Sequence, residues 1–341
     1  MNINVLSGLL LIAIGAFTSG SFSVPLLKVR GWKWENSWLA FSLFAYIIVP
    51  LILCLIFSPG FIKVYQSVSS IKLTWILFLG FIYGIANLTF GLSLRYLGLS
   101  LGYALSLGLM MALGTLVPPL LDGKLATMFQ SGNGNLLIAG VIVSAIGIAI
   151  SAYAGIQRDK TQNKKPGNEF NLPKGLLSAL IVGIFGATLS LAIEQGKPLA
   201  DLAIANGTNP LFQDSPVFLL IYSGSFVSTF FWCMIIAKRN RSIRNFIKTE
   251  EKTVSANYLF AGLAGFLWFI NFFFFGMGKS RMGNITYTSW GILMTLTIVC
   301  ATLWGIYHGE WKGVSKKIYL TMWLGLLILI VAAFMIGISG S

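Results

Sequence analysis

Neutral amides and aromatic rings interrupt the long apolar stretches of this sequence, and their chemistry is the easiest to interpret. Asn87 lies within the apolar run 73–94, and Asn271 lies within the run 257–278. An amide donates and accepts hydrogen bonds, and in an apolar environment it needs partners for both. Tryptophan and tyrosine rings add a flat apolar face beside a polar edge. Together these groups suit a ligand with several hydroxyl groups and an apolar C–H face, which is the chemistry of a sugar.

Helical spacing brings several of these side chains onto shared faces. Trp268, Asn271 and Phe275 follow one another at i, i+3 and i+7, so one helix would present all three to the same side. The full set of candidate ligand-binding residues is Asn87, Tyr103, Trp268, Asn271, Tyr287, Ser289 and Trp290. Taken singly, each of them could instead link helices or fill the core, as Asn and Ser often do in membranes. Their occurrence in both halves of the chain favours a shared cavity.

The elements that must position these residues are membrane helices. Hydrophobic residues make up 56% of the 341 residues, charged residues 10%, and the mean hydropathy is +0.81, too apolar for a water-soluble surface. Apolar stretches of about 20 residues can cross the hydrocarbon layer as helices, whose backbone groups bond internally. We predict an all-α integral membrane protein with ten transmembrane helices, at 4–25, 37–58, 73–94, 98–120, 136–156, 175–195, 214–237, 257–278, 284–306 and 318–338.

The net charge of +14 is distributed unevenly over the connections between these spans. The connections that follow the first, third, fifth, seventh and ninth spans hold 18 of the 24 Lys and Arg residues, and the others hold 6. Short basic connections stay in the cytoplasm, so we expect both termini on the opposite side. The basic charge then orients the protein in the membrane and indicates no nucleic-acid partner.

The two halves of the chain resemble each other. Asn87 precedes Arg95 by eight residues, and Asn271 precedes Lys279 by the same number. The fourth and ninth spans both end with Thr-Leu, followed by Gly with a nearby acid and Lys. These matches fall at corresponding positions, which indicates a duplicated unit of five helices.

Two copies of five helices form an inverted repeat, because an odd number of spans makes the second copy enter the membrane from the opposite side. We predict the first repeat at 1–156, a cytoplasmic connection at 157–174 and the second repeat at 175–341. Inverted repeats are common in secondary transporters, which bind their substrate near the middle of the membrane. Asn87 and Asn271 would then approach a central site from opposite sides.

Ion coupling has a weaker signal in this sequence. Glu194 shares a helical face with Ser190, Ala187 and Gly183, so it could point inward and titrate. It also lies three residues before Lys197, which equally fits a charge at the membrane interface. We therefore name Glu194 as a candidate for ion coupling, with an interfacial role as the alternative.

Catalytic and metal chemistry have no signature here. The three cysteines lie in apolar spans, where a thiol behaves as a small hydrophobic side chain. A membrane-embedded enzyme or sensor would need a catalytic cluster of His, Asp and Ser or a soluble output domain, and the sequence indicates neither. We expect no enzymatic activity, no catalytic residues, no cofactor and no metal.

Five segments, in their order and spacing, resemble the bacterial L-rhamnose-proton symporter family: WKWENSW (32–38), NLTFGLSLRYLGLSLG (87–102), EFNLPKGL (169–176), GIFGATLSLAIEQGKP (183–198) and GFLWFINFFFFGMG (265–278). The resemblance covers the whole chain. That family belongs to the drug/metabolite transporter superfamily of ten-helix inverted-repeat carriers. The resemblance draws attention to Trp34, Glu35, Asn87, Arg95, Trp268, Tyr287, Ser289 and Trp290. The chain departs from the family pattern at Asn271, where a larger amide is expected, and at Thr286, where an acid is expected.

The resemblance implies a transporter of the bacterial inner membrane, with both termini in the periplasm, that imports L-rhamnose or a related monosaccharide by symport with protons. Glu35 and Arg95 are a candidate cytoplasmic gate, although Arg95 could serve only as a topology signal. The expected partners are a sugar, a proton and membrane lipid, and we expect a monomer or a weak dimer. The alternative is another carrier of the superfamily, which exports amino acids or metabolites or couples a sugar to a different ion.

Overall fold

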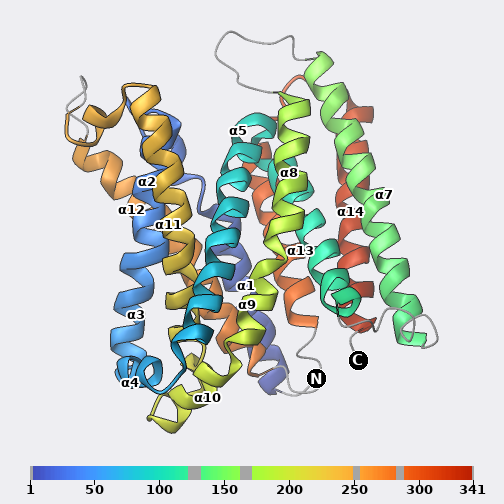
Figure 1. Cartoon of the computed structure of the whole chain (residues 1–341). Coiled ribbons are helices and arrows are strands. Elements are labelled where there is room, and N and C mark those ends of the chain that lie inside the picture. Colours follow the sequence, from blue (N-terminus) through green and yellow to red (C-terminus); the bar gives the residue numbers. More distant parts are fainter. Residues whose placement is uncertain (1–2, 122–131, 162–170, 249–253, 282–287, 340–341) are drawn as a thin grey trace. The chain divides into compact units, whose positions relative to one another are not determined.

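The structure is a computed structural model that describes residues 3–121, 132–161, 171–248, 254–281 and 288–339 (Figure 1). Helices dominate these ranges, and no β-strand occurs within them, which confirms the all-α prediction. Seven helical stretches of the described residues are long and apolar enough to cross a membrane. A shorter apolar helix lies at Ile292–Tyr307.

The α-helices are α1 (Ile3–Ser21), α2 (Trp34–Leu43), α3 (Val49–Phe57), α4 (Phe61–Gln66), α5 (Ser70–Leu121), α7 (Gly132–Thr161), α8 (Leu172–Gly186), α9 (Thr188–Gln195), α10 (Lys197–Ala205), α11 (Ser215–Arg239), α12 (Val254–Lys279), α13 (Thr288–Tyr307) and α14 (Lys316–Ser339). The shorter elements are three 3-10 helices, η1 (Pro25–Lys28), η3 (Pro210–Phe212) and η4 (Ile243–Phe246), and one π-helical turn, η2 (Phe44–Ile48).

The long helix α5 consists of two helical segments that meet at a sharp break. Gly98 interrupts it with φ +80° and ψ 178°, a backbone conformation that only glycine adopts readily. Beyond the break the chain folds back on itself, because Ser93 Oγ lies 2.8 Å from Ser106 Oγ and the ring centres of Phe90 and Tyr103 lie 5.2 Å apart. A straight helix would separate residues 13 positions apart by about 20 Å. The break agrees with the predicted boundary between the third and fourth spans.

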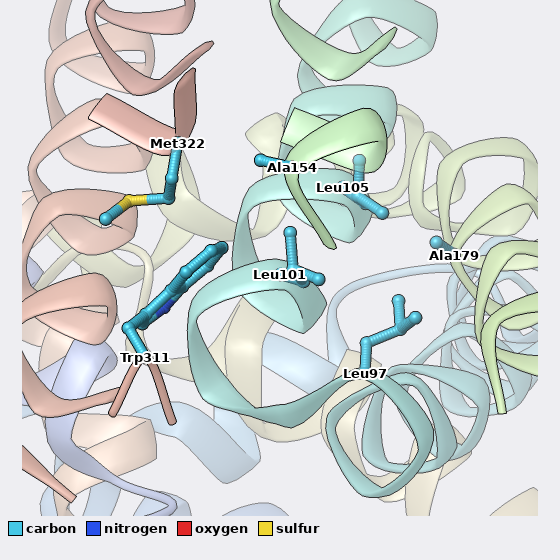
Figure 2. Close-up of a cluster of buried hydrophobic side chains, with 7 residues drawn as sticks. All are labelled: Leu97, Leu101, Leu105, Ala154, Ala179, Trp311 and Met322. Carbon is cyan, nitrogen blue, oxygen red and sulfur yellow. The ribbon is translucent and has the colours of Figure 1, made fainter. Parts of the chain in front are cut away.

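The chain forms two compact units, each of which contains segments from both predicted repeats. Unit 1 comprises Met1–Gly20, Ala86–Ala187 and Gly278–Ser341. Within it, α14 lies along α7 and also packs against α13 (Figure 1). Its core contains the side chains of Leu97, Leu101, Leu105, Ala154, Ala179, Trp311 and Met322 (Figure 2). Because these residues come from α5, α7, α8, α14 and the α13–α14 connection, the cluster fixes the hairpin of α5 within the unit.

Unit 2 comprises Ser21–Ile85 and Thr188–Met277. Helix α11 packs there against α2, η2, α3 and α10. It also contacts the first segment of α5, since Ser225 Oγ donates a hydrogen bond of 2.8 Å to the carbonyl of Gly80. A Cβ on Gly80 would lie 2.1 Å from the carbonyl oxygen of Ile221, so only glycine permits this approach of two helix backbones.

A π turn interrupts the helical stretch Trp34–Phe57 at η2. The backbone N–H of Val49 donates there to the carbonyl of Phe44, five residues earlier. Pro50 accounts for the change, because proline has no N–H to donate to the carbonyl of Tyr46, four residues earlier. A π turn widens the helix locally and is frequent at functional sites, and this one carries the buried side chain of Tyr46.

Candidate functional site

Aromatic side chains from α2, η2, α11 and α12 converge in unit 2. The ring centre of Trp268 lies 5.1 Å from that of Tyr46 and 5.0 Å from that of Tyr222, both in edge-to-face geometry. The two tyrosine rings stack 5.8 Å apart at an interplanar angle of 15°. Phe41 contacts Trp268 at 6.1 Å, and Trp38 contacts Phe41 at 4.9 Å. We call Trp38, Phe41, Tyr46, Tyr222 and Trp268 the aromatic cluster.

Three polar atoms of the aromatic cluster are buried without a hydrogen-bond partner among the described residues. They are the hydroxyls of Tyr46 and Tyr222 and the Nε1 of Trp38. Both tyrosines have an exposed fraction of 0%. Leaving such a group unsatisfied costs about 1–3 kcal/mol, and buried polar groups in proteins normally have partners. These three atoms therefore keep hydrogen-bonding capacity that the described protein groups do not use.

Two of the predicted ligand-binding residues lie at or beside the aromatic cluster. Trp268 is at its centre, as described above. Asn271, one turn later in α12, is buried, and its Nδ2 donates to the carbonyl of Trp268. This bond holds the amide against its own helix backbone, so one of its protons is already used.

Unit 1 contains three further predicted residues. Asn87 and Ser289 are buried, and neither Asn87 Nδ2 nor Ser289 Oγ has a hydrogen-bond partner within the described part of the chain. The hydroxyl of Tyr103, by contrast, donates to the carbonyl of Ser19 at 2.9 Å. Asn87 and Ser289 thus keep hydrogen-bonding capacity for a ligand, whereas Tyr103 joins α5 to α1.

The remaining aromatic candidates lie outside the described positions. Tyr287 falls outside the described residues, and of Trp290 only the backbone is described. Asn87 belongs to unit 1 and Asn271 to unit 2. The expected approach of these two amides to one site stays a prediction.

Glu35 is a buried acid in the first turn of α2. Its Oε1 accepts hydrogen bonds from Ser242 Oγ at 2.6 Å and from Asn240 Nδ2 at 3.0 Å. Arg95 is exposed on α5 and belongs to unit 1, whereas Glu35 belongs to unit 2. Their predicted role as a gate stays a prediction.

Glu194 differs from its expected environment. Its side chain is exposed on α9, although Gly183 and Ala187 are buried. The expected inward face assumed one continuous helix, but α8 ends at Gly186 and α9 begins at Thr188. The coupling role of Glu194 stays a prediction.

Comparisons with known proteins point to the same family, and their matches cover nearly the whole length of this chain. A model of the L-rhamnose-proton symport protein family matches residues 1–341. The chain is 33% identical over 338 residues to the L-rhamnose-proton symporter of Pectobacterium carotovorum subsp. carotovorum (strain PC1), covering 98% of both chains. It is 31% identical over 342 residues to that of Yersinia pestis (strain Pestoides F), covering 99% of both. The chain belongs to the L-rhamnose-proton symport protein family.

Membership of the symport protein family confirms the resemblance that the five segments predicted. The family consists of symport transporters and not of enzymes, and the apolar helices make this member a multi-pass membrane protein. Among the described residues, no group of three or more His, Cys, Asp or Glu side chains could hold a metal ion.

A second acid of this symport protein was not predicted from the sequence. Glu310, in the connection between α13 and α14, accepts hydrogen bonds from the backbone N–H groups of Leu99 and Ser100, the latter at 3.0 Å. These N–H groups open the second segment of α5 directly after Gly98, where a helix has no internal acceptors for them. Glu310 therefore caps that segment, and its negative charge interacts favourably with the positive N-terminal end of the helix dipole.

Arg158, in the last turn of α7, binds the end of the first segment of α5, on the N-terminal side of the break at Gly98. Its Nη2 donates to the carbonyl of Leu97 at 2.9 Å, and its Nη1 lies 3.7 Å from Glu310 Oε2. The guanidinium also lies 5.0 Å from the ring centre of Trp311, whose Nε1 donates to Ser100 Oγ at 3.0 Å. Figure 2 shows the Trp311 ring directed toward Leu101 of the core. An arginine of α7 thus acts together with an acid and a tryptophan of the α13–α14 connection to stabilise one helix break.

The sequence offers only indirect signals for Tyr46, Tyr222, Arg158 and Glu310, which were not among the predicted site residues. Tyr46 and Tyr222 lie in strongly apolar runs, where a hydroxyl group attracts little notice. The acid and the arginine lie 152 positions apart, at 310 and 158. One usable signal was Gly98 inside an apolar run, because such a glycine commonly marks a turn or a close approach.

Proposed function

We propose that this protein imports L-rhamnose, or a closely related deoxy sugar, together with protons across the bacterial inner membrane. The observation that carries the proposal is the full-length match to a family of sugar symport proteins. The relatives named above are L-rhamnose-proton symporters in Pectobacterium and Yersinia. The match covers 98–99% of this chain and of the relatives, so the similarity includes all the helices that a transporter of this family would use.

The aromatic cluster supports a sugar as the substrate. The hydroxyls of Tyr46 and Tyr222 and the indole N–H of Trp38 would bond to sugar hydroxyls, and Trp268 would pack against the C–H face of the ring. A deoxy sugar also carries a methyl group, which the apolar ring edges would accommodate. From unit 1, Asn87 stays a proposed ligand-binding residue.

We also propose ten membrane spans in two inverted repeats, with both termini in the periplasm. The basic connections support this topology. In unit 1 the break at Gly98, the end of α7 at Arg158 and the α13–α14 connection at Glu310 lie together, and all three follow odd-numbered predicted spans. In unit 2 the first and seventh connections meet at Glu35 and Ser242. Connections that lie in contact must be on the same side of the membrane, so these contacts agree with the proposed topology.

The decisive experiment is uptake of labelled L-rhamnose into proteoliposomes that contain the purified protein. We expect accumulation when the pH outside is lower than inside, and none after a protonophore collapses the gradient. Protein-free liposomes are the control. Accumulation that needs a sodium gradient, or gradient-driven export of amino acids without sugar uptake, would favour another carrier of the superfamily and contradict the proposal.

The first prediction concerns the hydroxyl groups of Tyr46 and Tyr222 and separates their effect on sugar binding from their effect on stability. Tyr46→Phe and Tyr222→Phe should each weaken sugar binding about tenfold, because a ligand hydroxyl loses its partner. Thermal stability without sugar should be unchanged or higher, because each substitution removes an unsatisfied buried hydroxyl.

Tyr65→Phe is the matched control for these variants. The hydroxyl of Tyr65 donates to the carbonyl of Pro216 at 2.7 Å, so its loss should lower stability by about 1 kcal/mol and leave sugar affinity unchanged. Calorimetric titration and thermal unfolding of purified, monodisperse protein measure both effects. Full sugar affinity in Tyr46→Phe and Tyr222→Phe would remove the aromatic cluster from the binding site.

A further inference from the structure

Glu35 is a buried acid whose hydrogen-bond donors are neutral. Its exposed fraction is 2%, and its donors are Ser242 Oγ and Asn240 Nδ2. A buried acid held by an arginine stays ionised, because protonation would leave the buried cation without a counter-charge. Neutral donors impose no such penalty, and the Ser242 hydroxyl can reverse to accept from a protonated acid. Glu35 can therefore change its protonation state without leaving an unpaired buried charge.

Lys33 and Cys233 both act on Glu35 electrostatically, but neither is hydrogen-bonded to it in the described structure. Lys33 is exposed and donates its Nζ to the backbone carbonyl of Asn240 at 2.8 Å. Cys233 of α11 is close enough to interact with Glu35 electrostatically, and its thiol is buried. Neither group fixes the charge of Glu35 by a direct ion pair, since the lysine is bound to a carbonyl oxygen.

The other acids with described side chains fit a proton carrier less well. Glu194 and Asp201 are exposed. Asp214, at the start of α11, is half-buried and has a bonding partner. Glu310 is paired with Arg158. Among the acids with described side chains, Glu35 is the buried one whose hydrogen-bond partners carry no charge.

The backbone around Ser242 is strained in a way that brings its hydroxyl to Glu35. Arg241 has φ +53°, a left-handed conformation that costs a non-glycine residue free energy. Arg241 follows the C-terminal end of α11 in a Schellman motif, in which the backbone N–H of Ser242 donates a hydrogen bond of 2.9 Å to the carbonyl of Ala237. Asn36 Nδ2 then donates to the carbonyl of Ser242 at 3.0 Å. The turn is thus held against the first turn of α2.

The same helix connects Glu35 to the aromatic cluster. Trp38 lies three residues after Glu35 in α2, so both side chains lie on neighbouring turns of one helix face. The indole N–H of Trp38 is one of the three unsatisfied donors of the aromatic cluster. A movement of the first turn of α2 would therefore change both the acid and a donor for the sugar.

We propose that Glu35 takes up and releases the proton that crosses the membrane with the sugar; this inference rests on the proposed function. A proton from water adds to the carboxylate to give the neutral acid, and the same proton later leaves to water, with no other bond formed or broken. The ionised form accepts strong hydrogen bonds and holds Ser242 and Asn240 against α2. Protonation weakens these bonds, so it favours a state in which the turn and the helix separate.

The test compares exchange with accumulation in proteoliposomes. Glu35→Gln mimics the protonated acid and should keep sugar-for-sugar exchange, while it loses both accumulation driven by a proton gradient and sugar-driven proton uptake. Asp201→Asn, which neutralises an exposed acid of unit 2, is the matched control and should keep both. Gradient-driven accumulation by Glu35→Gln at the wild-type level would overturn the inference. A wild-type protein that moves no protons with L-rhamnose would instead refute the proposed function.

A second variant tests the inference while the acid stays in place. Ser242→Ala removes a donor that favours the ionised form, so the midpoint of the pH profile of uptake should rise by about one pH unit. Ser67→Ala, whose hydroxyl bonds only the carbonyl of Lys63 in the described structure, should leave the midpoint unchanged. An unchanged midpoint in Ser242→Ala would overturn the role of Glu35.

Discussion

Glu310 in unit 1 and Glu35 in unit 2 both join chain segments that are far apart in the sequence, but they are bound by different kinds of donor. Glu310 is held by two backbone N–H groups and by the guanidinium of Arg158. Glu35 is held by a hydroxyl and an amide. The first acid has a fixed counter-charge, and the second has none within hydrogen-bonding reach among the described residues.

The difference indicates how one membrane protein can use two acids for two purposes. Removing partly buried Glu310 would leave the buried charge of Arg158 without compensation, which is costly, so Glu310 is suited to a permanent structural role. An acid with neutral donors loses less when it is protonated. The role of an acid therefore depends on the charge of its partners as well as on its burial.

The largest expected effect comes from neutralising the two acids in turn. Glu310→Gln should lower the free energy of unfolding by about 3 kcal/mol, because Arg158 loses its counter-charge. Glu35→Gln should cost at most about 1 kcal/mol, because glutamine still accepts from Ser242. Unfolding titrations in detergent measure both. Equal losses in the two variants would break the comparison.

A smaller effect is expected at the turn that Glu310 caps. Gly98→Ala should cost about 2 kcal/mol, because the new Cβ would occupy an unfavourable backbone conformation and lie 2.8 Å from Glu310 Oε1. Gly207→Ala is the matched control, since Gly207 also has a positive φ, +89°, but nothing lies within 4 Å of the point that a Cβ would occupy there. It should cost about 1 kcal/mol. If both glycines tolerate alanine equally, the contact with Glu310 is unimportant for stability.

The smallest expected effect is a gain in unit 2. Arg241→Gly should raise the free energy of unfolding by about 0.5–1 kcal/mol, because glycine adopts the left-handed conformation without strain. Arg244→Gly, in the 3-10 helix η4, has no positive φ to relieve and should be neutral or destabilising. Chemical unfolding of the two variants distinguishes them. A loss of stability in Arg241→Gly would mean that the arginine side chain matters more than the strain.

The helical architecture could be predicted because it depends on local properties of the sequence. Apolar runs long enough to cross the membrane predicted the helices, and the boundary between 73–94 and 98–120 predicted an interruption close to Gly98. The polar and aromatic face of one helix also drew attention to Trp268, whose ligand-binding role stays a prediction. Each of these features depends on spacing within a single segment, which the sequence contains directly.

The partners of the buried groups could not be predicted in the same way. Ser242 and Glu35 are 207 residues apart, and no periodicity within one helix relates them. The unsatisfied hydroxyls of Tyr46 and Tyr222 are likewise defined by what surrounds them. The short interruption between α8 and α9 is likewise not visible in the hydropathy of the sequence.

The contact between the first segment of α5 and α11 has a mechanical consequence for transport. Packed helices slide past each other when a layer of side chains between them can change rotamers, which is the shear type of motion. No such layer exists where Gly80 faces the carbonyl of Ile221 and Gly224 faces that of Leu77. Sliding there would force two backbones to collide and would break the bond from Ser225 to Gly80. These two helices must move as one rigid pair during the transport cycle.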